Sequence, residues 1–170
     1  MLCSASLAAS CAAPQSAPPP PAPKPVVARP APPLPLPPTP ADWRDAAQTA
    51  GTWRWALEGG NSTASFGVVG YAPAARMVCE RAKGRVILMR SGNASAAVPM
   101  AVRTTSTMRP LSSDPVISPQ SWLAVALPAR DPLLDAIAFS RGRFAFEAAG
   151  LATLYLPAQP ELSRVIEDCR

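Results

Sequence analysis

The sequence predicts a mainly β (α+β) fold: an antiparallel β-sandwich or open barrel of about eight strands, with one short helix and a packed C-terminal helix. Three observations favour it. Short segments alternate between apolar and polar residues with a period of two, Gly- and Pro-containing turns separate them, and strands do not alternate with helices as in a parallel sheet. Residues 41–170 form this single domain, which is long enough to bury a core.

The first two predicted strands carry aromatic side chains. In residues 51–58 (GTWRWALE), Trp53, Trp55 and Leu57 share one face, a pattern typical of a half-buried strand. Residues 63–69 follow a Gly-Gly-Asn turn and form the second strand. This alternation favours tryptophans in the core over tryptophans exposed as a platform for sugars.

The middle of the domain adds four strands, at residues 76–81, 85–90, 98–103 and 122–127. Apolar residues on both faces of 85–90 predict burial on both sides. Pro99 marks an edge strand or a bulge, because proline cannot donate to a ladder. Residues 104–107, three of them β-branched threonines, are expected to continue this strand, and residues 110–120, with three prolines, are expected to form a loop.

The last forty residues begin with a helix and a hairpin. Asp131-Pro132 is a favourable helix start, because Asp caps a free N–H and Pro at the first helical position loses no hydrogen bond. A helix of about two turns follows. Phe144 and Phe146 then share one face of a strand, and the Ala149-Gly150 turn leads into a second strand at 151–156.

A final helix begins near Pro160. Leu162, Val165, Ile166 and Cys169 recur at positions i, i+3, i+4 and i+7, which places them on one apolar stripe. We therefore expect this helix to pack on the sheets with Cys169 facing inward.

Composition excludes several kinds of chemistry. The chain has no histidine, so catalysis by Ser-His-Asp or Cys-His and zinc bound by histidine are both excluded. No Walker A motif, GxGxxG motif or metal-ligand cluster is present, and no cofactor or metal is predicted. Once Lys24 and Arg29 are set aside, residues 41–170 hold 14 basic and 11 acidic residues, too small an excess to indicate nucleic-acid binding.

The N-terminal residues resemble the signal peptide of a bacterial lipoprotein. Leu7-Ala8-Ala9-Ser10-Cys11 is similar to a lipobox, in which cleavage before the cysteine frees it for lipidation. Residues 1–10 would be the signal peptide, and Cys11 would anchor the protein in a membrane. Ala8 stands where leucine is preferred, and no basic residue precedes Cys11. A start codon further upstream would supply the missing basic and apolar residues; other forms of export, or a coincidence, are the alternatives.

Residues 11–40 connect this cysteine to the domain, and 14 of the chain's 23 prolines lie among them. Proline fixes φ and removes hydrogen-bond donors, so the segment is expected to be an extended polyproline II tether. Docking on an SH3-like groove is the alternative for a proline-rich segment.

Removal of the signal peptide leaves Cys79 and Cys169 as a pair. In an oxidising compartment outside the cytosol such a pair is expected to form a structural disulfide. Two buried free thiols in a cytosolic protein are the alternative.

One basic region is a candidate anion-binding site. Between residues 76 and 109 there are seven basic residues and one acidic residue, and Arg81, Lys83 and Arg85 surround a glycine turn. With Arg103 they could bind lipid phosphate, a carboxylate of an envelope polymer or an acidic partner. The alternative is a solvated basic rim without a ligand.

The order of these features resembles that of small exported β-domains of bacterial envelopes, of the invasion-associated locus B and VasI types. The matching residues are Cys79, Arg103, Phe144–Phe146, Gly150-Leu151 and Cys169. The C-terminal segment is also similar to uncharacterised proteins of alphaproteobacteria, particularly sphingomonads. This resemblance implies a non-enzymatic role in the envelope.

We therefore expect a lipid-anchored protein of the cell envelope whose β-domain binds another envelope protein or an anionic polymer. An unanchored periplasmic or secreted accessory or inhibitor domain is the alternative. An unrecognised hydrolase is a third hypothesis; Lys83, the one lysine of the domain, would have to serve any Ser-Lys pair.

Overall fold

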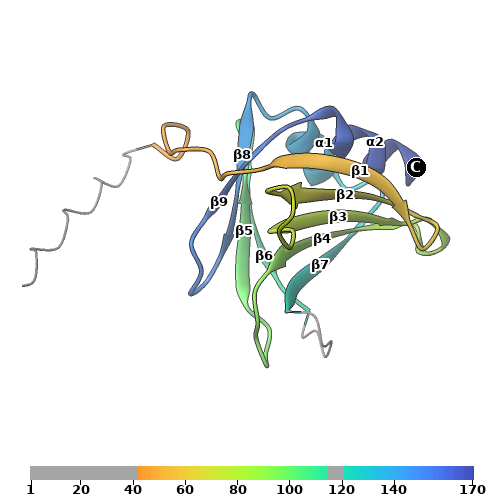
Figure 1. Ribbon diagram of the computed structural model, residues 1–170, viewed down its shortest axis with the longest axis horizontal. Helices are drawn as coiled ribbons and strands as arrows, with labels where there is room; N and C mark the ends of the chain where they lie inside the picture. The colour runs from red at the N-terminus through yellow and green to blue at the C-terminus, as the bar shows by residue number, and fades with distance from the viewer. Residues whose placement is uncertain (1–41, 115–120) are drawn as a thin grey trace, which may run out of the picture. The chain divides into compact units, whose positions relative to one another are not determined.

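The computed structural model describes residues 42–114 and 121–170, and these residues form two open antiparallel sheets and two α-helices (Figure 1). The larger sheet has the order β1-β2-β3-β4-β7, and the smaller has the order β6-β5-β8-β9. The predicted mainly β sandwich is confirmed, and the sheets do not close into a barrel.

The strands of the larger sheet are β1 (Thr52–Glu58), β2 (Asn61–Gly67), β3 (Ala75–Glu80), β4 (Arg85–Ser91) and β7 (Trp122–Pro128). Those of the smaller sheet are β5 (Pro99–Arg103), β6 (Met108–Ser112), β8 (Arg143–Ala148) and β9 (Leu154–Pro157). The helices are α1 (Pro132–Ala138) and α2 (Pro160–Asp168), and a single 3-10 turn, η1 (Arg81–Lys83), joins β3 to β4.

The core lies between the sheets, whose strands run across one another, and α2 packs at one end against β1, β2 and β3 (Figure 1). Phe66 and Met77 come from the larger sheet, and Phe144 and Phe146 from the smaller one. Each such side chain, once buried, contributes about 1.5–3 kcal/mol of hydrophobic stabilisation. None of the helices in the described part of the chain is long and apolar enough to span a membrane.

Both predicted helices are present with the expected ends. The Asp131 carboxylate accepts a hydrogen bond from the Leu133 backbone N–H at 2.8 Å, which caps α1. A side-chain hydrogen bond from Arg109 holds the pKa of this carboxyl below its usual range. In α2, Leu162, Val165 and Ile166 are buried, as their spacing predicts.

A ninth strand, β6, contradicts the prediction for residues 104–112. Residues 104–107 do not extend β5 but form a tight turn, in which the Thr104 N–H donates to the Thr107 carbonyl at 2.8 Å. The first residues of the expected 110–120 loop belong to β6, where Pro110 pairs with Ala101. Proline is tolerated there because β6 is an edge strand. Residues 115–120 lie outside the described residues.

Pro99 was wrongly expected to mark an edge strand or bulge. Its strand, β5, lies between β6 and β8, and Pro99 is the first residue of that strand. At a strand's first position the missing N–H interrupts little of the ladder, and the Pro99 carbonyl still accepts from the Ala149 N–H at 2.9 Å.

Burial on both faces of β4 is also a wrong prediction. Val86, Leu88 and Arg90 are buried on one face, while Ile87 and Met89 on the other are half-buried. Arg90 is not part of a surface basic region: it is 3% exposed and donates to the carbonyls of Phe146, at 3.1 Å, and Ala152, at 2.9 Å. It therefore joins the two sheets, and burial lowers its pKa.

Two strands start two or more residues away from the predicted position. The second strand starts at Asn61 rather than residue 63, because Asn61 already pairs with Glu58. The last strand starts at Leu154 rather than residue 151, since the turn after β8 is longer than its Ala-Gly pair suggests.

Candidate functional site

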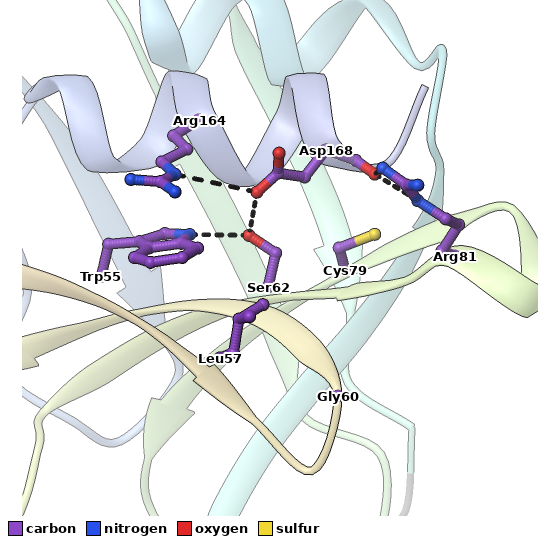
Figure 2. Close-up of a pocket in the computed structure, with 8 residues that line it drawn as sticks. All are labelled: Trp55, Leu57, Gly60, Ser62, Cys79, Arg81, Arg164 and Asp168. Atoms are coloured by element: carbon purple, nitrogen blue, oxygen red, sulfur yellow. Dashed lines mark hydrogen bonds and ion pairs between the residues drawn. The ribbon is translucent and has the colours of Figure 1, made fainter.

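A groove of about 320 Å³ lies between the β1–β2 hairpin, the end of β3 and α2 (Figure 2). It is lined by Trp55, Leu57, Gly60, Ser62, Cys79, Arg81, Arg164 and Asp168.

The groove exists because β1 extends beyond the part of the sheet that is fully covered. Trp53, Trp55 and Leu57 share one face, as predicted, but Trp53 is 4% exposed, Trp55 is half-buried and Leu57 is 65% exposed. The prediction of core tryptophans therefore holds for Trp53, which packs on Phe66 and donates its indole N–H to the Pro157 carbonyl at 2.9 Å. Trp55 instead forms a wall of the groove.

A chain of hydrogen bonds fixes Trp55 to α2. The Trp55 indole N–H donates to Ser62 Oγ at 2.8 Å, and the Ser62 hydroxyl donates to Asp168 Oδ2 at 2.5 Å (Figure 2). Ser62 is 6% exposed, so its hydroxyl has these two partners in place of water. The chain orients the indole ring and the Asp168 carboxylate relative to each other.

Arg164 lies over this wall. Its guanidinium carbon is 3.3 Å from the centroid of the Trp55 ring, and its Nε is 4.0 Å from Asp168 Oδ2. A cation held over an indole face is stabilised by about 0.5–2 kcal/mol, depending on its exposure. Within residues 42–114 and 121–170, the Arg164 guanidinium makes no hydrogen bond, and its side chain is 56% exposed. Its donors are thus available to a ligand.

Arg81 has a different part in the same groove. Its guanidinium donates from Nε, at 2.6 Å, and from Nη2 to the backbone carbonyl of Asp168 (Figure 2). The last carbonyls of a helix lack partners within the helix and carry partial negative charge. Arg81 therefore stabilises the end of α2, which is a structural use of its charge.

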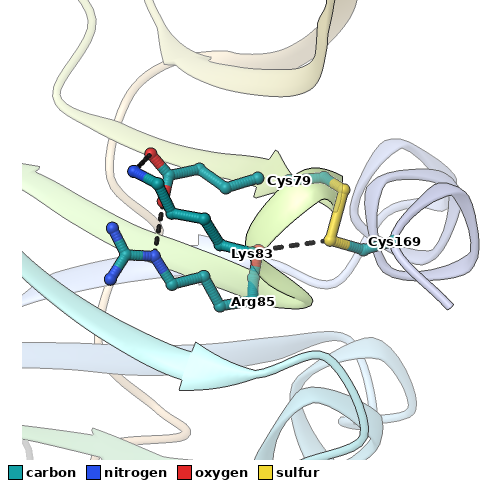
Figure 3. A network of polar contacts seen from close by, with 5 residues as sticks. Cys79, Lys83, Arg85 and Cys169 are labelled. Atoms are coloured by element: carbon teal, nitrogen blue, oxygen red, sulfur yellow. Dashed lines mark hydrogen bonds and ion pairs between the residues drawn. A yellow bond between two sulfur atoms is a disulfide. The ribbon is translucent and has the colours of Figure 1, made fainter.

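The predicted disulfide between Cys79 and Cys169 is present, with the two Cα atoms 5.4 Å apart. It fastens the residue after α2 to β3 (Figure 3), and Cys79 also lines the groove. Cys169 Sγ also lies 3.2 Å from the Arg85 carbonyl oxygen, a contact that cannot be a hydrogen bond while the sulfur carries no proton. The disulfide thus holds in place the helix that carries Arg164 and Asp168.

The four residues of the predicted anion site are only partly brought together. Arg81, Lys83 and Arg85 surround η1, but Lys83 and Arg85 both pair with Glu80, the former at 3.2 Å (Figure 3). The Arg85 hydrogen bond contributes most, together with the pairing to Lys83, to holding the pKa of the Glu80 carboxyl below its usual range. Arg103 lies on β5 of the other sheet and pairs with Glu147 at 3.1 Å. Anion binding by this set stays a prediction.

The lining of the groove does not contain a Ser-His or Ser-Lys pair. A serine nucleophile needs a neighbouring base such as histidine or lysine, and neither lines the groove. Lys83 is paired with Glu80 instead. Among the described residues, no three His, Cys, Asp or Glu side chains gather to hold a metal ion.

No protein-family model, curated protein or solved structure matches the chain. The resemblance to exported β-domains therefore stays a prediction, as does lipidation of Cys11, which lies outside the described residues. The function has to be argued from the groove itself.

Sequence reasoning missed Arg164, Ser62 and Asp168. The i, i+4 spacing of Arg164 and Asp168 was a signal that they could pair. Nothing in the sequence indicates that this face of the last helix meets Trp55, more than one hundred residues earlier.

Proposed function

We propose that this chain is a non-enzymatic binding domain of the cell envelope, held at a membrane by a lipid on Cys11. Its ligand, part of an envelope protein or polymer, would occupy the groove beside Trp55. One observation carries the proposal: Arg164 is immobilised on Trp55 while its hydrogen-bond donors are unused among the described residues. A stacked guanidinium whose one ionic partner among the described residues, Asp168, lies 4.0 Å from its Nε is suited to recognition, because little side-chain entropy is lost when it binds.

Two further features support the location. The Cys79–Cys169 disulfide is of the kind that persists in oxidising compartments outside the cytosol. The lipobox-like residues before Cys11 and the proline-rich residues 11–40 have the order of an anchor followed by a tether. Such a tether would let the groove reach a ligand some distance from the membrane.

The anchor is tested by replacing one cysteine at a time. Full-length wild-type protein and the Cys3→Ala variant should both sediment with membranes when produced in a bacterium that processes lipoproteins. The Cys11→Ala variant should be soluble or unprocessed, because the acceptor of the lipid is gone. Cys3→Ala is the matched control, since it removes an N-terminal cysteine outside the lipobox-like sequence.

If Cys11→Ala still sediments with membranes and is processed as the wild type is, the lipid anchor is wrong. Export of a soluble wild-type protein would instead favour an unanchored periplasmic or secreted accessory domain.

A further inference from the structure

The groove beside Trp55 contains a guanidinium that is fixed in position and still able to bind. Arg164 is stacked on the indole at 3.3 Å, and the ring in turn is held by its hydrogen bond to Ser62. Stacking occupies the face of a guanidinium and leaves its edge, with the N–H donors, directed outward. The natural partner for two parallel N–H donors is the pair of oxygens of a carboxylate.

Charge in the groove also favours an anion. Arg164 and Arg81 contribute two positive charges to the lining, and Asp168 contributes one negative charge. Arg81 donates Nε and Nη2 to the Asp168 backbone carbonyl, so its cation stays near the groove without occupying it. Asp168 Oδ2 accepts from the Ser62 hydroxyl and lies 4.0 Å from Arg164 Nε, so it pairs with the Nε side of the guanidinium and leaves the two Nη groups without a partner among the described residues (Figure 2).

The remaining lining is poor in free hydrogen-bonding side chains. The Trp55 indole N–H and the Ser62 hydroxyl are used in the chain that ends at Asp168. Leu57, 65% exposed, provides an apolar surface on the same side, and the disulfide of Cys79 closes the back. A sugar needs many hydrogen bonds for its hydroxyls, and the Trp55 face that could have stacked on a sugar is covered by Arg164.

We infer that the groove binds the C-terminal carboxylate of a short peptide segment whose last residue has a small apolar side chain. The carboxylate pairs with the edge of Arg164, and the apolar side chain packs against Leu57. This inference rests on the proposed function, because it names the ligand of the groove that the proposal uses. A volume of about 320 Å³ accommodates one or two small residues rather than a folded partner.

The test is a titration of the full chain, followed by NMR of the tryptophan indole N–H signals. N-acetyl-alanyl-alanine is the probe, and its C-terminal amide is the matched control ligand. The carboxylate should shift the Trp55 indole signal with a dissociation constant in the millimolar range or tighter, and the amide should bind at least tenfold more weakly. A Trp55→Phe variant assigns the signal.

Variants then locate the site. Arg164→Gln should weaken binding at least tenfold, and Arg164→Lys should not restore it fully, because an ammonium cannot form the two parallel hydrogen bonds. Arg141→Gln is the matched control, since it removes an exposed arginine outside the groove, and it should bind as the wild type does. The Trp55 indole signal in Arg164→Gln, still hydrogen-bonded to Ser62, verifies that the groove remains folded.

Equal binding of the carboxylate and the amide, or unchanged binding by Arg164→Gln, would overturn the inference. If glucuronate or inorganic phosphate binds through Arg164 and the dipeptide does not, the peptide ligand is wrong while the groove remains the proposed binding site. If none of these anions binds in a way that depends on Arg164, both the inference and the groove's role in the proposed function fail.

Discussion

The disulfide between Cys79 and Cys169 should supply a large part of the domain's stability. The two residues are 90 positions apart, so the bond closes a long loop in the unfolded chain. The relation ΔS ≈ −2.1 − 1.5R ln n, with n of 90, gives an entropy change of the unfolded chain of about −15.5 cal/mol/K, which corresponds to about 4.6 kcal/mol of stabilisation at 25 °C. Since domains of this size are stable by about 5–15 kcal/mol in total, the disulfide-free protein should be marginal.

Urea unfolding measures this effect. In a background where Cys3 and Cys11 are serine, the oxidised protein is compared with the same protein under reductant and with a Cys79→Ala/Cys169→Ala variant. With an m-value of about 2 kcal/mol per molar, the midpoint should fall by about 2 M. Reductant should leave the double variant unchanged, because no disulfide remains to be broken.

A loss of less than about 1 kcal/mol on reduction would refute this reasoning. It would mean that the unfolded chain is already compact around these residues, so that closing the loop removes little entropy. A second consequence concerns the groove: since the disulfide holds the end of α2, reduction should also broaden the Trp55 indole signal.

Three further predictions concern the fold. Arg90→Ala should lose about 2–5 kcal/mol in urea unfolding, because it leaves buried carbonyls without a donor and opens a cavity. Arg90→Met should lose less, since its side chain fills the space; equal losses would contradict this. In the same measurement, Gly51→Ala should destabilise the domain more than Gly59→Ala. The new Cβ at residue 51 would lie 2.8 Å from the Gly67 carbonyl carbon, whereas Gly59 faces open space and its substitution costs only about 1 kcal/mol, from the positive φ. The reverse order would show that the β1–β2 ladder relaxes freely. The Arg109 hydrogen bond lowers the pKa of Asp131, so this pair stabilises the fold above about pH 4 and ceases to do so as the pH falls through the folded-state pKa. Acidification should therefore reduce the stability of Arg109→Met less than that of the wild type. Identical stability profiles in acid would contradict this prediction.

Local patterns predicted most of the fold. The period of two placed Phe144 and Phe146 on a buried face, and the capping residues located α1 and α2, because these signals act within a few residues. The disulfide followed from an even cysteine pair together with the expectation of export.

The errors arose where contacts distant in sequence decide. Pro110 suggests a loop until β5 supplies its partner, and Arg90 reads as a surface charge until the carbonyls of the other sheet receive it. The candidate groove is of the same kind: Trp55, Ser62 and Arg164 meet only because α2 returns to the β1–β2 hairpin. The predicted basic cluster was chosen by the density of charge along the chain. That density does not show which cations already have partners, as Lys83 and Arg85 do in Glu80.

The intact mass of the mature protein isolated from its native host, measured with and without reductant, reports on both the lipid anchor and the disulfide. We expect a chain that begins at Cys11 and carries a diacylglycerol and an acyl group, with Cys79 and Cys169 each gaining one hydrogen on reduction. An unlipidated chain that retains the residues before Cys11 and whose mass does not change with reductant would contradict both the anchor and the oxidising compartment.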